Sequence, residues 1–402
     1  MAELAKLSEA APTVAVCGHI AVDIIPKFEE AGGGGLRLTP GSLLEVGEAA
    51  FCTGGAVSNT GIALHRLGAN VRLVGKVSDD VFGALTIRLL RDVHPALAEH
   101  IAQVPGETSS YTIVVNPPGM DRIFLHCPGT NDTFSGSDID WERLAGATHF
   151  HFGYPPLMRG MYADGGDRLA ALLRRAKESG MTVSLDMAMP GKGTAADAAD
   201  WIGILKKALP YVDVFLPSLE ETLRMAMRDR YEELCREGGD LCETTPEETI
   251  RELGERLLDL GCGIAALKLG ASGLYLRSGE RGFGDDPAWR RRELWAPCFR
   301  TTVAGTTGAG DCTIAGFLNG LLHGLAPEDA ITGAVAVGAF SVERLDATSG
   351  IAPWDVVQER VRAGWDRLPT GRTLTNWRLD GRTRAYIGPA DETQAASPRS
   401  GE

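Results

Sequence analysis

The run of small residues that ends in Asp311 carries the clearest chemical signal of the chain. Residues 305–311 read GTTGAGD and lead directly into the apolar stretch 312–318, which indicates that a helix begins there. A helix N-terminus offers backbone N–H groups without partners, and its dipole favours an anion. A carboxylate beside such a pocket is electrostatically costly, which indicates a task for Asp311. Taking the proton from a hydroxyl that attacks a phosphate is one such task.

The composition limits the class of protein. The chain has 402 residues, of which 44% are apolar and 23% charged, as in globular proteins with a sizeable core. A net charge of −13 argues against a nucleic-acid partner but not against small anions held by local N–H groups. No apolar run could span a membrane, and residues 1–6 begin no signal peptide. The eight cysteines form no C-x-x-C pair. We therefore expect a cytoplasmic protein with reduced thiols and no membrane partner.

The alternation of β-branched runs with helical patterns predicts an α/β fold with a mainly parallel sheet. Strands are expected at 13–17, 71–75, 149–153, 182–186, 212–216 and 264–269, and helices at 57–67, 168–178, 249–260, 314–322 and 330–344. Two further runs, 111–115 and 122–126, flank the turn 116–121 and form a β-hairpin. A small antiparallel lid that stands off the main sheet explains this hairpin.

Three segments depart from this pattern. Residues 31–35 form a Gly-rich tip, and residues 228–248, dense in Glu and Arg, are expected to form a solvated helical excursion. From about Gly388 onward the chain is polar, which predicts disorder.

Several known phosphate-binding and metal-binding motifs are missing. The segment 191–194, GKGT, lacks the spacing of a P-loop. The chain contains no protein-kinase signature and no His-Glu-x-x-His. His149 and His151 alternate on one predicted strand, and with His126 they are assigned to packing of the core or the lid floor rather than to a metal. Any phosphate chemistry must therefore use another scaffold.

Three segments in order resemble the ribokinase-like (PfkB) family of carbohydrate and nucleoside kinases. The first spans residues 54–83 and contains GGAVSNTGIA, LGA and GKVSDDVFG; the second is KLGASG at 268–273; the third is TTGAGD at 306–311. Each motif alone is weak, but the three together are specific. Their order and spacing fit from about Val14 to Val361.

This resemblance implies a three-layer α/β sandwich with a mainly parallel central sheet and a small β-sheet lid. The kinase domain is expected to cover residues 1–375, with the lid built from about 24–53 and 108–128. Residues 376–402 are expected to form a partly disordered C-terminal tail.

The resemblance also assigns the catalytic residues. It implies that Asp311 is the general base, whereas a helix-capping Asp is the alternative. It implies that Gly308, Ala309 and Gly310 offer N–H groups to the γ-phosphoryl oxygens. The alternative for these residues is a Gly-rich turn that needs a positive φ.

The same resemblance places the substrate site after the first strand and at the first motif. It implies that Asp23 accepts hydrogen bonds from substrate hydroxyls, at the strand ends where α/β folds bind ligands. The alternative is a surface Asp at the lid entry. Gly54, Gly55 and Asn59 are assigned to the same site, and the alternative is a helix entry with Asn59 on the exposed face.

ATP and Mg²⁺ are the implied cofactors. Gly270 and Gly273 are expected to let the adenine and ribose lie close to the backbone, with Lys268 nearby at the ATP site, and a β-hairpin turn is the alternative. Where the family carries Asn-x-x-Glu, this chain has Ser218 and Glu221. Glu221 is expected to help hold Mg²⁺ through water, or else only to complement a helix dipole. Ser218 is assigned to the ATP site although the family carries Asn at this position.

Three positions depart from the family pattern. Gly305 stands where the family carries an Asp that helps bind a monovalent cation, which argues against potassium activation. Ser78 replaces a common Gly, and Ala56 stands where ribokinases carry Lys, which disfavours ribose as the substrate.

The predicted function is ATP-dependent phosphorylation of a sugar hydroxyl. A nucleoside kinase of the same family and a non-catalytic sugar-binding protein on this fold are the alternatives. The exposed lid edge also favours a homodimer.

Overall fold

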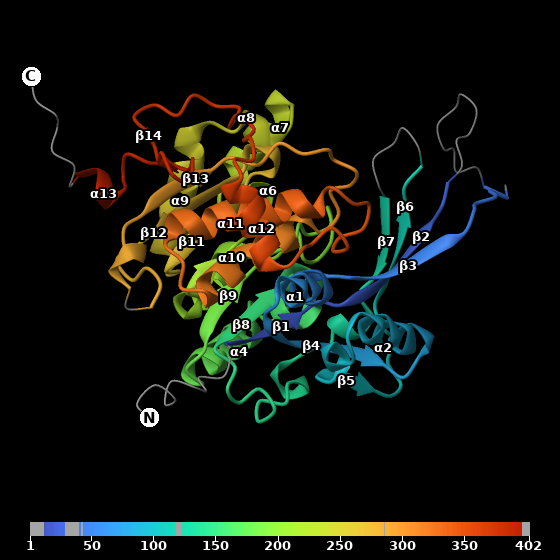
Figure 1. Ribbon diagram of the computed structural model, residues 1–402. Helices are drawn as coiled ribbons and strands as arrows, with labels where there is room; N and C mark the ends of the chain where they lie inside the picture. Colours follow the sequence, from blue (N-terminus) through green and yellow to red (C-terminus); the bar gives the residue numbers. More distant parts are fainter. Residues whose placement is uncertain (1–11, 29–39, 42, 118–122, 285, 396–402) are drawn as a thin grey trace, which may run out of the picture.

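Two β-sheets of different size organise the chain (Figure 1). The computed structural model describes residues 12–28, 40–41, 43–117, 123–284 and 286–395. Within them, the large sheet has the strand order β14-β15-β13-β12-β11-β10-β9-β8-β1-β4-β5 and the small sheet the order β3-β2-β6-β7. The expected Gly-rich tip at 31–35 and most of the expected hairpin turn lie outside the described residues.

The parallel part of the large sheet contains the strands that the sequence predicted and one further strand, at residues 101–104, that it did not predict. It consists of β1 (Thr13–Gly18), β4 (Asn70–Ser78), β5 (Ile101–Val104), β8 (His149–Gly153), β9 (Thr182–Leu185), β10 (Val214–Phe215) and β11 (Ile264–Lys268). The strands are apolar because both faces of the sheet are covered. Val14 and Val16 pack into one apolar cluster, whereas Ala15 and Cys17 pack into another on the opposite face.

Helices cover both faces of the large sheet (Figure 1). One cluster holds residues of α1 (Ala56–Leu67), α2 (Val81–Val93), α10 (Ala309–Leu322), α11 (Pro327–Ser341) and α12 (Trp354–Arg362). The other holds residues of α3 (Arg159–Tyr162), α4 (Asp167–Glu178), α5 (Trp201–Ala208), α6 (Leu219–Ala226), α7 (Arg228–Glu237), α8 (Leu241–Thr244) and α9 (Glu247–Asp259). The predicted three-layer α/β fold is therefore confirmed, and the segment 228–248 is helical as expected.

The C-terminal segment extends the large sheet on its antiparallel side. The strands there are β12 (Leu274–Ser278), β13 (Glu293–Ala296), β14 (Arg378–Leu379) and β15 (Tyr386–Ile387), followed by α13 (Glu392–Ala395). The prediction of disorder from Gly388 onward is wrong for the residues around Asp391, which is 2% exposed. The Asp391 carboxylate accepts hydrogen bonds from Arg292 Nε and the Glu293 N–H, both at 2.9 Å. These partners explain how a polar segment can be buried.

The division at residue 375 stays a prediction, and residues 396–402 lie outside the described part of the chain. No helix in the described ranges is long and apolar enough to cross a membrane. The cytoplasmic location expected from the sequence stays a prediction.

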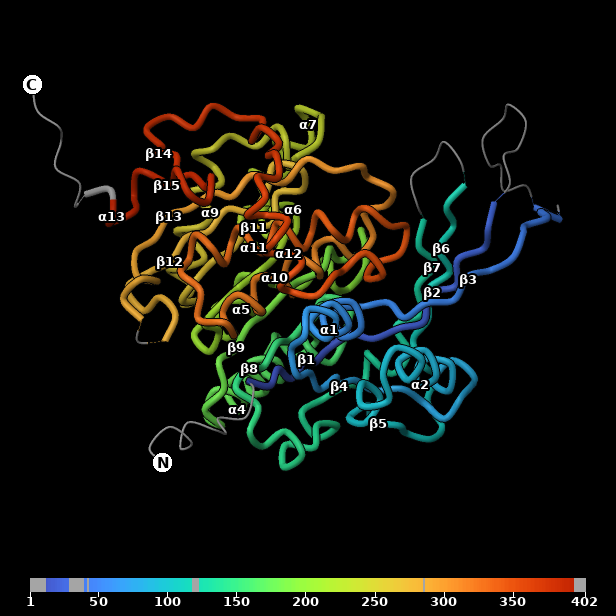
Figure 2. Tube along the Cα trace, viewed as in Figure 1, coloured from blue at the N-terminus to red at the C-terminus, as the bar shows by residue number. Residues whose placement is uncertain are grey.

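The small sheet stands away from the large one, beyond α1 and α2 (Figure 1). Its strands are β2 (Ala21–Pro26), β3 (Ala49–Gly54), β6 (Tyr111–Val115) and β7 (Ile123–Cys127). The pair β2 and β3 and the pair β6 and β7 are far apart in the sequence, and Figure 2 shows that they run side by side. β2 joins them, because it pairs with both β3 and β6. The expected hairpin is formed by β6 and β7. The fold therefore contains the small β-sheet that was predicted as a lid.

Candidate active site

Two cavities meet at the N-terminus of α10. One has a volume of about 510 Å³ and lies beside the ends of β10 and β11; we call it the nucleotide cavity. The other, of about 790 Å³, lies between the lid and the large sheet; we call it the acceptor cavity. Tyr154, Thr306, Gly308 and Asp311 line both. A group held at this junction can therefore contact ligands in both cavities.

The first turn of α10 forms one wall of the junction. Gly308 caps the helix with φ +71°, and a Cβ placed on it would lie 2.4 Å from the Ala347 Cβ. Only glycine fits this position. The Ala309 N–H donates to the Thr306 carbonyl oxygen at 3.3 Å. The alternative given for the motif, a Gly-rich turn that needs a positive φ, is thus present at the helix start. Residues 308–311 also line the nucleotide cavity.

The Asp311 carboxylate is buried and fixed by two donors. Its exposed fraction is 2%. Asn59 Nδ2 donates to its Oδ2 at 2.9 Å, and the Tyr154 hydroxyl lies 2.8 Å from both oxygens. Burial raises the pKa of Asp311, while the Lys268 ammonium and these hydrogen bonds oppose the rise. Asn59 is buried, so the alternative that placed it on the exposed face of the helix is wrong.

Tyr154 is a site residue that the sequence analysis missed. It follows β8 directly and has φ +65°, a left-handed conformation that is uncommon outside glycine. Pro155 comes next and disfavours the right-handed helical conformation at Tyr154. Burial and the nearby Asp311 raise the pKa of the Tyr154 phenol well above its usual value, so the phenol keeps its proton and donates. An aromatic residue before two prolines at a strand end is the signal that could have found it.

The predicted substrate residues gather in the acceptor cavity, which Asp23, Gly55 and Asn59 all line. A Cβ placed on Gly54 would lie 2.4 Å from an Asp23 carboxylate oxygen, so this glycine makes room for the carboxylate. Gly55 has φ +89° and packs against His19. Burial raises the pKa of Asp23 to about 6, although a hydrogen bond from Thr112 opposes the rise. Asp23 is therefore a partly buried carboxylate that lines the acceptor cavity.

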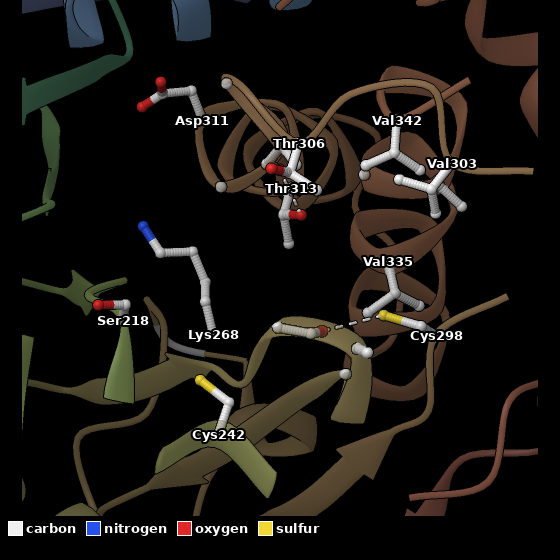
Figure 3. Close-up of a pocket in the computed structure, with 18 of the residues that line it drawn as sticks. Ser218, Cys242, Lys268, Cys298, Val303, Thr306, Asp311, Thr313, Val335 and Val342 are labelled. Atoms are coloured by element: carbon white, nitrogen blue, oxygen red, sulfur yellow. Dashed lines mark hydrogen bonds between the residues drawn. The ribbon is translucent and has the colours of Figure 1, made fainter. Parts of the chain in front are cut away.

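Lys268 reaches into the nucleotide cavity from the end of β11, towards Asp311 (Figure 3). Its Nζ lies 2.8 Å from Asp186 Oδ1, and a Cβ placed on Gly310 would be 3.6 Å from that Nζ. Burial by itself lowers the pKa of Lys268, but the carboxylates of Asp186 and Glu221 more than compensate and raise it. The ammonium therefore lies at the α10 end of the cavity.

Asp186 is the second residue that the sequence analysis missed. It follows β9 and is fully buried, and burial raises its pKa to about 8 even beside Lys268. Its Oδ2 has no hydrogen-bond partner among the described residues. Glu221 lines the same cavity. A buried carboxylate oxygen without a partner, close to a second carboxylate, suits a divalent cation.

Ser218 and Glu221 cap α6 and also line the nucleotide cavity. The Ser218 N–H donates to Glu221 Oε2 at 2.8 Å, and the Glu221 N–H donates to Ser218 Oγ at 3.3 Å. Glu221 therefore lies at the N-terminus of α6, where its charge complements the helix dipole, as the alternative for this residue proposed. This cap uses Oε2 of Glu221, and Oε1 accepts no hydrogen bond from the described residues.

Gly270 and Gly273 lie in the turn between β11 and β12, which pair as an antiparallel hairpin. Gly273 has φ +106°, and a Cβ on it would lie 2.0 Å from the Ala296 carbonyl oxygen, so the hairpin itself requires this glycine. Both glycines also line the nucleotide cavity. The cavity wall beyond them is apolar and includes Phe299, Val303, Val335, Ala339, Val342 and Leu368. The nucleotide cavity thus has one charged end and one apolar end.

The chain is similar to known carbohydrate kinases in its sequence and its fold. The sequence model described as "pfkB family carbohydrate kinase" matches residues 11–355. A protein of Archaeoglobus fulgidus named "Uncharacterized sugar kinase" is 28% identical over 292 residues, covering 72% of this chain and 98% of that protein. The 2-dehydro-3-deoxygluconokinase of Bacillus subtilis is 24% identical, covering 84% of this chain and 90% of that protein.

A solved structure of Arabidopsis thaliana ribokinase, complexed with ribose and ATP, has the same fold. The TM-score is 0.66 at 20% identity, covering 87% of this chain and 98% of that one.

Proposed function

Because the chain belongs to the pfkB family of carbohydrate kinases, we propose that it transfers the γ-phosphoryl group of ATP to a sugar hydroxyl, with Asp311 as the general base. The observation that carries this proposal is the position of Asp311. Its buried carboxylate lies at a helix N-terminus where a 510 Å³ cavity and a 790 Å³ cavity meet. A base at such a junction can contact an acceptor on one side while the phosphoryl group approaches from the other.

In the proposed reaction the acceptor hydroxyl gives its proton to Asp311. Oδ2 already accepts from Asn59, so Oδ1 has the freer lone pairs and takes the proton. The acceptor oxygen forms a bond to the γ-phosphorus, and the bond from that phosphorus to the β–γ bridging oxygen breaks, which releases ADP. Tyr154 and Asn59 keep the carboxylate in its orientation.

Charge that develops on the phosphoryl group is stabilised from the α10 side. The N–H groups of Gly308, Gly310 and Asp311 are the proposed donors, together with the Lys268 ammonium. The Ala309 N–H was assigned the same role, but it already donates to a backbone carbonyl in this structure, so we propose a smaller part for it.

We place the adenine at the apolar end of the nucleotide cavity, against Gly270 and Gly273, and the phosphates near Lys268 and Ser218. Mg²⁺ would be held by Glu221 and by the unpartnered oxygen of Asp186. When bound, the ion neutralises phosphate charge.

Potassium activation is not part of the proposal. Gly305 has no side chain that could ligate the cation, and a Cβ there would make tight contacts, at 3.0 Å from the Leu345 carbonyl oxygen and 3.1 Å from that of Arg344.

On the acceptor side, Asp23 accepts hydrogen bonds from sugar hydroxyls, and Gly54 and Gly55 let the sugar approach the backbone. A nucleoside is the second candidate acceptor. The observation that favours it is the size of the acceptor cavity and the presence of Phe124 and Tyr162 in its lining, since aromatic rings can pack against a base.

The test is ADP formation with Mg²⁺ across a panel of sugars and nucleosides, comparing the wild type with Asp311→Asn. We expect acceptor-dependent turnover in the wild type and a loss of about 10²- to 10⁴-fold in the variant. Equal turnover in the variant would remove Asp311 as the base. Binding of a sugar without any turnover would instead support the non-catalytic alternative.

A homodimer through the lid is also proposed. Direct cross-strand pairs place Phe51, Ile24, Ile113 and Leu125 in one row on the outer face of the small sheet. Phe51 is 49% exposed and Leu125 is 54% exposed, so a second copy of the chain could cover the row. Light scattering should give a dimer mass for the wild type and a monomer mass for Leu125→Asp. A monomeric wild type would contradict the proposal.

A further inference from the structure

The charged side chains in the acceptor cavity are acidic. Asp23, Asp132 and Asp311 line it, from the lid to the start of α10. None of its lining residues in the described part of the chain is Lys or Arg. The pKa of Asp23 reflects this surrounding: burial raises it, and no cation among the described residues lowers it.

Two histidines in the same cavity add no positive charge at neutral pH. The Nε2 atoms of His19 and His126 lie 3.4 Å apart, and His126 Nδ1 lies 3.0 Å from Thr112 Oγ1. Burial, together with the neighbouring His126, lowers the pKa of His19 to about 3. Burial also lowers the pKa of His126, although Asp132 opposes that change. The pair can donate or accept hydrogen bonds, as sugar hydroxyls require.

Lys268 offsets part of the effect of burial on the pKa of Asp311. It lies in the nucleotide cavity, where it is paired with Asp186, and it does not line the acceptor cavity. Lys192 lies in sequence between two lining residues, Gly191 and Thr194, but its own side chain is exposed and does not line the acceptor cavity. An anionic substituent brought into this cavity would lose water and meet like charges, which is strongly unfavourable.

We infer that the acceptor is an uncharged polyhydroxylated compound, a neutral sugar or nucleoside, and not a sugar phosphate or sugar acid. This inference rests on the proposed kinase function and narrows its substrate class. It also separates this chain from its 2-dehydro-3-deoxygluconokinase relative, whose named acceptor is a sugar acid.

Matched acceptor pairs that keep a free primary hydroxyl test the inference. Suitable pairs are fructose with fructose 6-phosphate and ribose with ribose 1-phosphate, with adenosine as a further neutral acceptor, all at one fixed ionic strength. For the best pair, kcat/KM of the neutral member should exceed that of its charged partner by more than about tenfold, because like charges in a desolvated site repel. A ratio at or below this value would overturn the inference.

Lys192→Gln is the matched control, because Lys192 is the exposed cation that could be recruited to an anion. We expect the same neutral-to-charged ratio as in the wild type. A selective loss of activity towards the charged acceptor would show that Lys192 supplies the missing charge, and would overturn the inference. Absence of turnover with every acceptor would instead remove the proposed kinase function on which the inference rests.

Discussion

The hydroxyl oxygen of Tyr154 lies 2.8 Å from both carboxylate oxygens of Asp311. These residues are 157 positions apart in the chain and meet where the two cavities join. Tyr154 holds its place at φ +65°, a conformation that costs a non-glycine residue about 1–3 kcal/mol. The surrounding structure must offset this cost, which makes the contact a specific feature of the junction.

Tyr154→Phe should lower kcat by about tenfold or more, because a hydrogen bond to a charged group contributes about 1.5–3 kcal/mol. It should also move the acid limb of the kcat/KM profile to higher pH, because the hydrogen bond lowers the pKa of Asp311 and its loss lets that pKa rise further. Tyr162→Phe is the control, since Tyr162 lines the acceptor cavity but not the junction. A rise in kcat would indicate that Tyr154 competes with the acceptor hydroxyl.

The KM for the acceptor should rise as the pH falls through about 6. The pKa of Asp23 is raised to about 6, so its carboxylate is ionised above that pH and protonated below it. Only the ionised form offers both oxygens as acceptors to sugar hydroxyls. Asp23→Asn should give a higher acceptor KM that no longer changes in this pH range. Steady-state kinetics at saturating ATP would check this, and an unchanged pH dependence in the variant would contradict it.

Lys268→Met should lower kcat by about 100-fold, the usual loss when one preorganised group that stabilises transition-state charge is removed. The KM for ATP should rise as well. The fold should survive, because the pKa of Asp186 is already raised to about 8 and its carboxyl can become neutral once the ammonium is gone. Coupled-assay kinetics and a thermal melt would measure both effects. Lys268→Arg keeps the charge and should retain more activity; equal loss in both variants would argue that geometry, not charge, is decisive.

Truncation after residue 375 should strongly destabilise the protein. It removes β14 and β15 together with Asp391, which accepts from Arg292 and Glu293. A dispensable tail would instead leave the melting temperature unchanged. Truncation after residue 395 is the matched control and should have little effect. If the longer truncation does not fold, Asp391→Ala gives a second measurement, with an expected loss of about 3 kcal/mol in the free energy of unfolding from breaking a buried ion pair.

The sequence by itself determined most of the strands and helices of the core and the part of the site around Asp311. Periodicity identified the parallel strands except β5, and part of the helices that cover them, since burial on both faces leaves a local apolar pattern. The run 305–311 identified a helix start with Asp311 in its first turn, because capping and glycine requirements are local. The polar composition after Gly388, however, hid the burial of Asp391, because its partners Arg292 and Glu293 lie outside that segment.

Only the tertiary structure decided which side chains meet. Asn59, Tyr154 and Asp311 lie on three separate elements, and Lys268 pairs with an Asp186 that no motif marks. The order of the strands, and not their sequence spacing, brings the ends of β8, β9 and β11 to the same edge. The absence of cationic side chains from the described lining of the acceptor cavity likewise depends on which residues the lid and the strand ends place around one space. Long-range convergence of this kind leaves no local pattern, which is why the sequence alone could not decide it.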